Sequence, residues 1–167
     1  MAKWILEDDC LAPRGQIKIE YVGTNPFKIY QKVRDILSRV WGITSVDLWE
    51  RDFKWDTTAD PRQFYVRIYV NKGIDSRSRF FVEVVIQGIQ PSDIAKEGKV
   101  TILLSAKLKT EYERKSAFQK LPIYKGFLKI YNKLFYRDVR RGYLKICQSL
   151  VDKTWREFRT NLNIPVA

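Results

Sequence analysis

The chain has 167 residues, 45% of them hydrophobic, which suits one domain with a sizeable core and excludes wholesale disorder. Lys and Arg outnumber Asp and Glu by 31 to 19, for a formal net charge of +12, and histidine is absent. That absence removes the commonest general base and the commonest metal ligand. The sequence therefore disfavours enzymes and metal sites that depend on imidazole.

The positive charge is concentrated in the C-terminal part of the chain. Residues 1–100 carry 16 basic and 14 acidic side chains, whereas residues 101–167 carry 15 and 5. An excess placed in this way indicates one basic surface rather than a uniformly basic protein.

The two cysteines, Cys10 and Cys147, are too few for a four-ligand zinc site. We expect reduced thiols in a cytoplasmic protein, with a disulfide between them as the open alternative. No apolar run approaches the roughly 20 residues that span a bilayer, and the N-terminus turns acidic at Glu7, too early for a signal peptide.

The N-terminal half of the chain predicts a strand followed by a helix. Residues 16–22 alternate between apolar and polar side chains, which is typical of a half-buried strand. Asn25 and Pro26 then predict a helix start, with a capping residue before Pro at the first helical position. Apolar residues follow at helical spacing, and Gly42 is well placed to end the helix.

Further along the chain the pattern predicts more strands and then helices. The expected strands cover residues 45–56, 63–71, 78–87 and 99–109. Helical spacing begins at Ile123, is interrupted near Tyr136–Asp138, and continues as a long amphipathic helix over residues 139–162. We predict a single α+β domain over residues 1–167, with residues 1–14 as an N-terminal extension. Its antiparallel sheet would have about five strands, packed against one N-terminal helix and a long C-terminal helix.

This order of elements resembles the helix-grip fold of START-like lipid-transfer and polyketide-cyclase-type proteins. The residues that carry the resemblance are the strand of Ile17 to Val22, the helix entry at Asn25 and Pro26, and the helix of residues 139–162. The chain departs from the family, which usually has a second short helix and more strands. The resemblance implies an apolar ligand between the sheet and the terminal helix. Residues that would line such a cavity are Trp55, Val66, Leu104 and Phe158.

Basic residues recur at every fourth position between Lys125 and Lys145, with Asp138 as the one acid among them. Four-residue steps on a helix advance about 400°, so this row drifts by about 40° per step and divides into groups at 125–137 and 137–145. Aromatic residues lie between the cations; Phe127 and Tyr131 are at core-like spacing, and we interpret about two-thirds of these rings as buried.

We expect this basic region to contact the phosphates of RNA or of a ribonucleoprotein particle. A solvated helix face and attachment to an anionic membrane surface are the alternatives. The predicted phosphate-contacting residues are Lys125, Lys129, Lys133, Arg137, Arg140, Arg141 and Lys145.

Two constellations on the predicted strands suggest other chemistry. Glu50 and Asp52 would lie on one strand face about 7 Å apart, a pair that suits acid–base catalysis or Mg²⁺; a salt-bridged exterior face is the favoured interpretation. Tyr65 and Tyr69 flank Arg67 on another strand, as in sheets that stack bases; the favoured interpretation is that these side chains face the terminal helix or lie half-exposed on the sheet. No glycine-rich phosphate loop or activated nucleophile is present, so we expect a non-enzymatic protein without a metal or cofactor.

Overall fold

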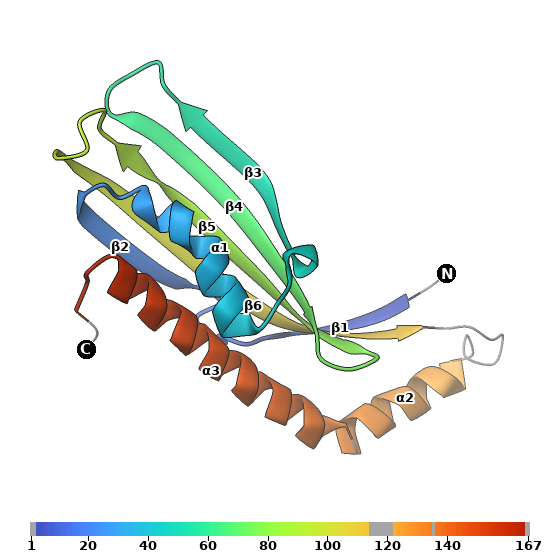
Figure 1. Ribbon diagram of the computed structural model, residues 1–167. Coiled ribbons are helices and arrows are strands. Elements are labelled where there is room, and N and C mark those ends of the chain that lie inside the picture. Colours follow the sequence, from blue (N-terminus) through green and yellow to red (C-terminus); the bar gives the residue numbers. More distant parts are fainter. Residues whose placement is uncertain (1–2, 114–121, 135, 166–167) are drawn as a thin grey trace.

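The computed structural model describes residues 3–113, 122–134 and 136–165. Within these residues a six-stranded antiparallel sheet carries two helices on one face (Figure 1), which confirms the predicted α+β class and the long C-terminal helix packed on the sheet. The strands are β1 (Lys3–Asp9), β2 (Ile17–Thr24), β3 (Leu48–Asp56), β4 (Arg62–Gly73), β5 (Ser78–Gln90) and β6 (Glu97–Glu113). The helices are α1 (Lys28–Trp41), the short 3₁₀ helix η1 (Ser45–Asp47), α2 (Pro122–Leu134) and α3 (Arg137–Asn161).

The longest strand, β6, organises one edge of the sheet. β5 pairs with one side of β6, while β2 and β1 follow each other along its other side. β2 pairs with Glu97–Leu104 and β1 with Lys107–Glu113. The segment expected to be an N-terminal extension therefore contains a strand of the sheet. Its sequence does not alternate: three apolar residues, Trp4 to Leu6, are followed by the acids Glu7 to Asp9, so no strand pattern was recognisable.

Helix α1 ends as predicted but begins later. Gly42 takes the left-handed conformation at the C-terminus of α1, with φ 58°, and Lys72 Nζ donates to the carbonyls of Trp41 and Gly42. At the other end Asn25 has φ 48°, so it forms a turn and the helix begins at Lys28. The Phe27 N–H donates to Gln90 Oε1 at 3.2 Å, so a side chain of β5 takes the place of the expected cap.

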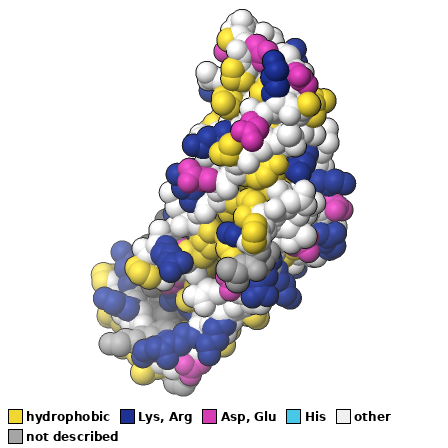
Figure 2. All heavy atoms as spheres, turned by 90° about the vertical axis from the view of Figure 1, so that its left-hand side faces the viewer, with side chains coloured by type: hydrophobic (Ala, Val, Ile, Leu, Met, Phe, Trp, Pro, Cys, Tyr) yellow, Lys and Arg dark blue, Asp and Glu magenta, His cyan; other side chains and the backbone are white. Residues whose placement is uncertain are grey.

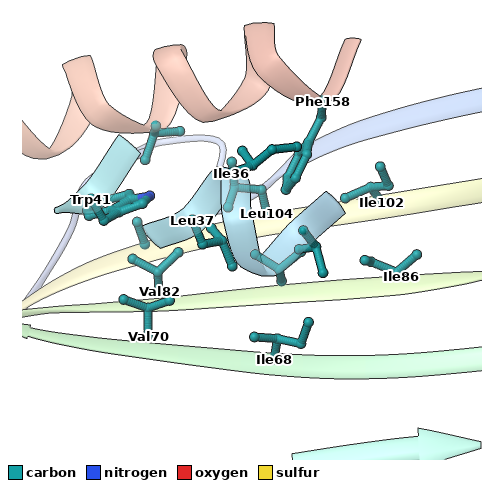
Figure 3. Packing of buried hydrophobic residues seen from close by; sticks show 14 of the residues in the cluster. Ile36, Leu37, Trp41, Ile68, Val70, Val82, Ile86, Ile102, Leu104 and Phe158 are labelled. Atoms are coloured by element: carbon teal, nitrogen blue, oxygen red, sulfur yellow. The ribbon is translucent and has the colours of Figure 1, made fainter. Parts of the chain in front are cut away.

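The hydrophobic core lies between the two helices and one face of the sheet. Figure 3 shows Ile36, Leu37 and Trp41 of α1 between α3 and the strands, and all three are almost fully buried. Phe158 of α3 and Leu104 of β6 belong to the same cluster and are fully buried. Each such apolar side chain contributes about 1.5–3 kcal/mol by leaving water, so this shared core holds helices and sheet together.

The four residues that the helix-grip resemblance placed around a ligand belong to this packing. Val66, Leu104 and Phe158 are fully buried among other core residues. Trp55 is half-buried at the edge of the sheet, where its ring centroid lies 4.4 Å from that of Phe27. A hollow of about 580 Å³ lies elsewhere, where β3 ends and β4 begins, and its lining includes Lys54, Tyr65, Gln87 and Lys99. Among the described residues, α1 occupies the place expected for the ligand.

Three contacts of different kinds attach α3 to the rest of the domain. Cys147 forms a disulfide with Cys10 in the connection after β1, and both side chains are fully buried. The Trp41 indole Nε1 donates to Thr154 Oγ1 at 3.0 Å. The third contact is an ion pair between Arg140 and Asp8.

The expectation of two reduced thiols is wrong, because the fold brings residues 137 positions apart in the sequence into contact.

We predict that Thr154→Val lowers the free energy of unfolding by about 1–3 kcal/mol, because it leaves the buried Trp41 N–H without its acceptor. Thr160→Val is the matched control, since Thr160 is exposed and donates to the carbonyl four residues earlier in the same helix. Urea unfolding would measure both. Equal effects of the two substitutions would contradict the role assigned to the buried contact.

We also predict that the double substitution Cys10→Ala with Cys147→Ala lowers the free energy of unfolding by about 2–5 kcal/mol. Without the cross-link the unfolded chain has a higher conformational entropy, and this favours unfolding. A reducing agent should destabilise the wild-type protein by a similar amount and leave the double variant unchanged. Identical unfolding midpoints for the wild-type protein with and without reductant would show that the bond does not form.

Candidate polyanion-binding surface

The basic residues that recur at every fourth position from Lys125 to Lys145 lie on two helices that meet at an angle. α2 ends at Leu134 and α3 begins at Arg137, which confirms the predicted interruption near Tyr136–Asp138. In Figure 1, α2 stands clear of the sheet at the N-terminal end of α3. Figure 2 shows dark-blue Lys and Arg side chains gathered at the lower end of the molecule, the end at which α2 lies in Figure 1.

Most of the cations predicted to contact phosphate are exposed. On α2 these are Lys125 and Lys129; the backbone of Lys133 belongs to α2, but its side chain lies outside the described residues. On the first turns of α3 the exposed cations are Arg137, Arg141 and Lys145. The sequence also suggested an extension of this surface by five more basic residues, Lys107, Lys109, Arg114, Lys115 and Lys120. Lys107 and Lys109 lie on β6 and pair with Glu7 of β1 at 3.5 and 3.1 Å, whereas the other three lie outside the described residues.

Arg140 departs from this group. Its side chain points inward, is 19% exposed, and pairs with the Asp8 carboxylate at the end of β1. Its buried Nε has no hydrogen-bond partner among the described residues. Because the guanidinium already neutralises an internal carboxylate, Arg140 holds α3 in place and is less available to an outside phosphate than its exposed neighbours.

The apolar face of α2 is exposed as well. Ile123, Phe127, Ile130 and Leu134 are between 55% and 69% exposed. Phe127, and Tyr131 at 46% exposed, thus depart from the expectation that most of these rings are buried. The spacing that predicts a core helix is present, but no described part of the chain covers this face of α2.

The turn between β4 and β5 holds the junction of the two helices. Asp75 Oδ2 accepts hydrogen bonds at 2.9 Å from the hydroxyls of both Tyr136 and Tyr143. Asp75 Oδ1 accepts from the backbone N–H groups of Arg77 and Ser78 at 2.7 and 2.6 Å. We did not predict this cluster from the sequence. The local signal is Asp75 itself, because an Asp in a turn often accepts hydrogen bonds from the backbone N–H groups two and three residues later.

The pKa values of this cluster follow from its contacts. Partial burial raises the pKa of Asp75, but the four hydrogen bonds to its carboxylate outweigh burial, and the net pKa lies below its ordinary value of 3.8. Burial, together with the bond to Asp75, raises the pKa of the Tyr136 hydroxyl to about 12. The carboxylate is therefore ionised and both hydroxyls keep their protons near neutral pH.

The paired carboxylates predicted on β3 do not meet. The pairing of β3 with β4 shifts register between Glu50 and Asp52, so the two side chains contact different residues. The Tyr30 hydroxyl of α1 donates to Glu50 at 3.0 Å, while Asp52 lies 3.8 Å from Arg67 of β4. The expectation that they share one face is wrong, since the extra residue of the bulge reverses the alternation.

The side chains of Tyr65, Arg67 and Tyr69, considered as a base-stacking platform, lie on the sheet face opposite the helices. Tyr65 and Arg67 are half-exposed there, while Tyr69 is buried. The Tyr65 hydroxyl accepts from Arg67 at 2.6 and 3.0 Å, and Arg67 also lies 3.4 Å from Glu83. The guanidinium of Arg67 is thus already engaged by Tyr65 and Glu83, and it has few donors left for a nucleic acid.

No family model describes the chain, and no curated protein is similar to it in sequence. Among solved structures it is similar to a protein of unknown function from Staphylococcus aureus, at 11% identity over 89% of this chain and 96% of that chain, with a TM-score of 0.25. A TM-score this low carries no argument about fold or function.

The described residues also bear on two other kinds of site, a membrane-spanning helix and a metal centre. No helix among them is both long and apolar enough to cross a membrane. No three His, Cys, Asp or Glu side chains in the described part of the chain gather around a common point where a metal ion would bind.

We predict that Asp75→Asn destabilises the domain by about 1 kcal/mol near neutral pH, a modest value because solvent screens this exposed turn. The pKa of Asp75 is lower in the folded than in the unfolded protein, so its contribution is complete from about one pH unit above the ordinary value of 3.8 and is lost as the pH falls through the lower folded-state pKa. Unfolding measured between about pH 6 and pH 3 should show the wild-type protein and Asp75→Asn converging at the acid end.

Asp93→Asn is the matched control, because Asp93 accepts a turn N–H at 3.0 Å in an exposed loop away from this cluster. A wild-type advantage over Asp75→Asn that stayed constant down to about pH 3 would contradict the assignment.

Proposed function

We propose that this protein is a non-enzymatic binding domain that attaches to a polyanionic partner through α2 and the first turns of α3. The observation that carries the proposal is the charge of α2: Lys125 and Lys129 are exposed, and residues 122–134 include no acidic side chain. Such a surface attracts phosphates, and RNA or a ribonucleoprotein particle is the partner class that the sequence favoured.

The attachment of α3 supports this proposal. Arg137 and Arg141 belong to a helix that the disulfide and the buried Trp41–Thr154 hydrogen bond fix to the core. The cations of the first turns therefore project from a rigid support, and the phosphate contacts need less ordering on binding. The START-like carrier of an apolar ligand stays an alternative proposal, which the packed core between sheet and α3 does not favour.

Binding of fluorescent poly(U) RNA and of phosphatidylserine-containing vesicles, measured across salt concentrations, tests this function. If five exposed cations meet the phosphates of a single strand, log affinity should fall against log salt with a slope of about −3.5. Replacing Lys125, Lys129, Arg137 and Arg141 with glutamine should remove most of this dependence and weaken binding to either polyanion.

The matched control removes the same charge elsewhere, by glutamine at the exposed residues Arg14, Lys32, Lys96 and Arg156. Salt-independent binding, equal losses in the two variants, or no binding to either polyanion would each overturn the proposed function.

A further inference from the structure

We propose that α2 is an interfacial helix that lies in the surface of an anionic lipid bilayer, with its apolar stripe in the acyl region and its lysines at the headgroups. This inference rests on the proposed polyanion-binding function and names the polyanion. The inference is argued from both faces of α2, the apolar stripe and the lysine side. A phosphate-binding surface would explain the lysines but not the exposed apolar stripe.

The apolar stripe of α2 is continuous and exposed. At 100° per residue, Ile123, Phe127, Ile130 and Leu134 fall within about 60° of the helix circumference. Their exposed fractions are 67%, 69%, 55% and 65%. Four large apolar side chains aligned in this way on a helix outside the core are typical of a surface that another apolar medium covers.

The charged side of α2 selects an anionic surface. Lys125 and Lys129 lie about 40° apart on the helix and on the side away from the stripe. Both are exposed, and no acidic residue lies between residues 122 and 134. Lysines in this position extend toward the headgroups while the apolar side chains insert, and each contributes about fivefold in affinity for an anionic membrane.

The place of α2 in the fold allows this contact. It stands clear of the sheet at the N-terminal end of α3 (Figure 1), and its apolar side chains are exposed. Its 13 residues are about 20 Å long, shorter than the roughly 30 Å hydrocarbon core of a bilayer. That length suits a helix lying in the interface plane and is too short for one that crosses the membrane.

Two other partners fit the same helix less well. RNA would neutralise the lysines, and a base could stack on Phe127. The aliphatic side chains Ile130 and Leu134 lie on the side of α2 away from Lys125 and Lys129, so a strand bound along the lysines would leave them in water. A second copy of this chain would cover the stripe, but α2 contains three lysines and no acid, so two such helices would repel each other. Thirteen residues also make fewer than two full heptads, a short length for a stable helix pair.

Vesicle co-sedimentation of the intact, oxidised protein tests the proposal. The probes are phosphatidylcholine vesicles with and without about one-third phosphatidylserine, and poly(U) RNA measured in parallel. We expect binding to the vesicles with phosphatidylserine and not to those of phosphatidylcholine alone, and tighter binding to the anionic vesicles than to poly(U). Phe127→Ser combined with Ile130→Ser should weaken it by about tenfold or more, since both side chains lose their apolar burial. Lys125→Gln combined with Lys129→Gln should also weaken it by about tenfold or more.

Matched controls carry the same substitutions at exposed positions elsewhere, Val46→Ser with Ile94→Ser and Lys32→Gln with Lys96→Gln, and should bind as the wild-type protein does. Circular dichroism checks that every variant is folded. Because the replaced α2 residues are exposed, loss of vesicle binding by a folded variant supports the proposal.

Each contrary outcome has a distinct meaning. RNA binding without vesicle binding, or vesicle binding that survives Phe127→Ser with Ile130→Ser, overturns the interfacial helix but leaves the polyanion function standing. A dimer in solution that these serine substitutions dissociate overturns it in favour of a second copy. Binding to neither probe overturns both proposals.

Discussion

The attachment of α3 to the covered face of the sheet is the constraint on which the rest of the structure depends. It combines a buried disulfide between Cys10 and Cys147, a buried hydrogen bond from Trp41 to Thr154, and an ion pair between Arg140 and Asp8. The disulfide joins α3 to the connection after β1, the hydrogen bond joins it to α1, and the ion pair joins it to β1. Because they are spread along α3, the helix has one position on the sheet, and the direction in which the chain enters it is fixed.

That fixed entry determines where α2 stands. The hydrogen bonds of Tyr136 and Tyr143 to Asp75 tie the junction of the two helices to the β4–β5 turn. α2 therefore stays at the periphery (Figure 1), and its apolar stripe, Lys125 and Lys129 are exposed. A rigid domain that holds one amphipathic helix away from its own core is well suited to place that helix on a surface, and this connects the fold to the proposed attachment to an anionic bilayer.

Local sequence patterns correctly predicted those features of the fold that depend on residues close together in the sequence. Alternation located β2 and the strands from β3 to β6, and Gly42 marked the end of α1, since strand faces and left-handed C-caps depend on nearby residues. Long-range contacts were beyond such reasoning: the Cys10–Cys147 bond depends on the path of the whole chain, and the bulge that separates Glu50 from Asp52 depends on pairing with β4. The stripe of α2 has the periodicity of a core helix, and only the three-dimensional arrangement shows that nothing in the described chain covers it.

Hydrogen–deuterium exchange of the intact protein, with and without phosphatidylserine-containing vesicles, tests the central claim most directly. The account predicts that amides of residues 122–134 exchange rapidly in the free protein and slow markedly on anionic vesicles, while the buried turns of α3 around Val151 and Thr154 exchange slowly in both states. Protection that appears on the uncovered face of the sheet around Tyr65, or no change in residues 122–134 although the protein is bound, would contradict it.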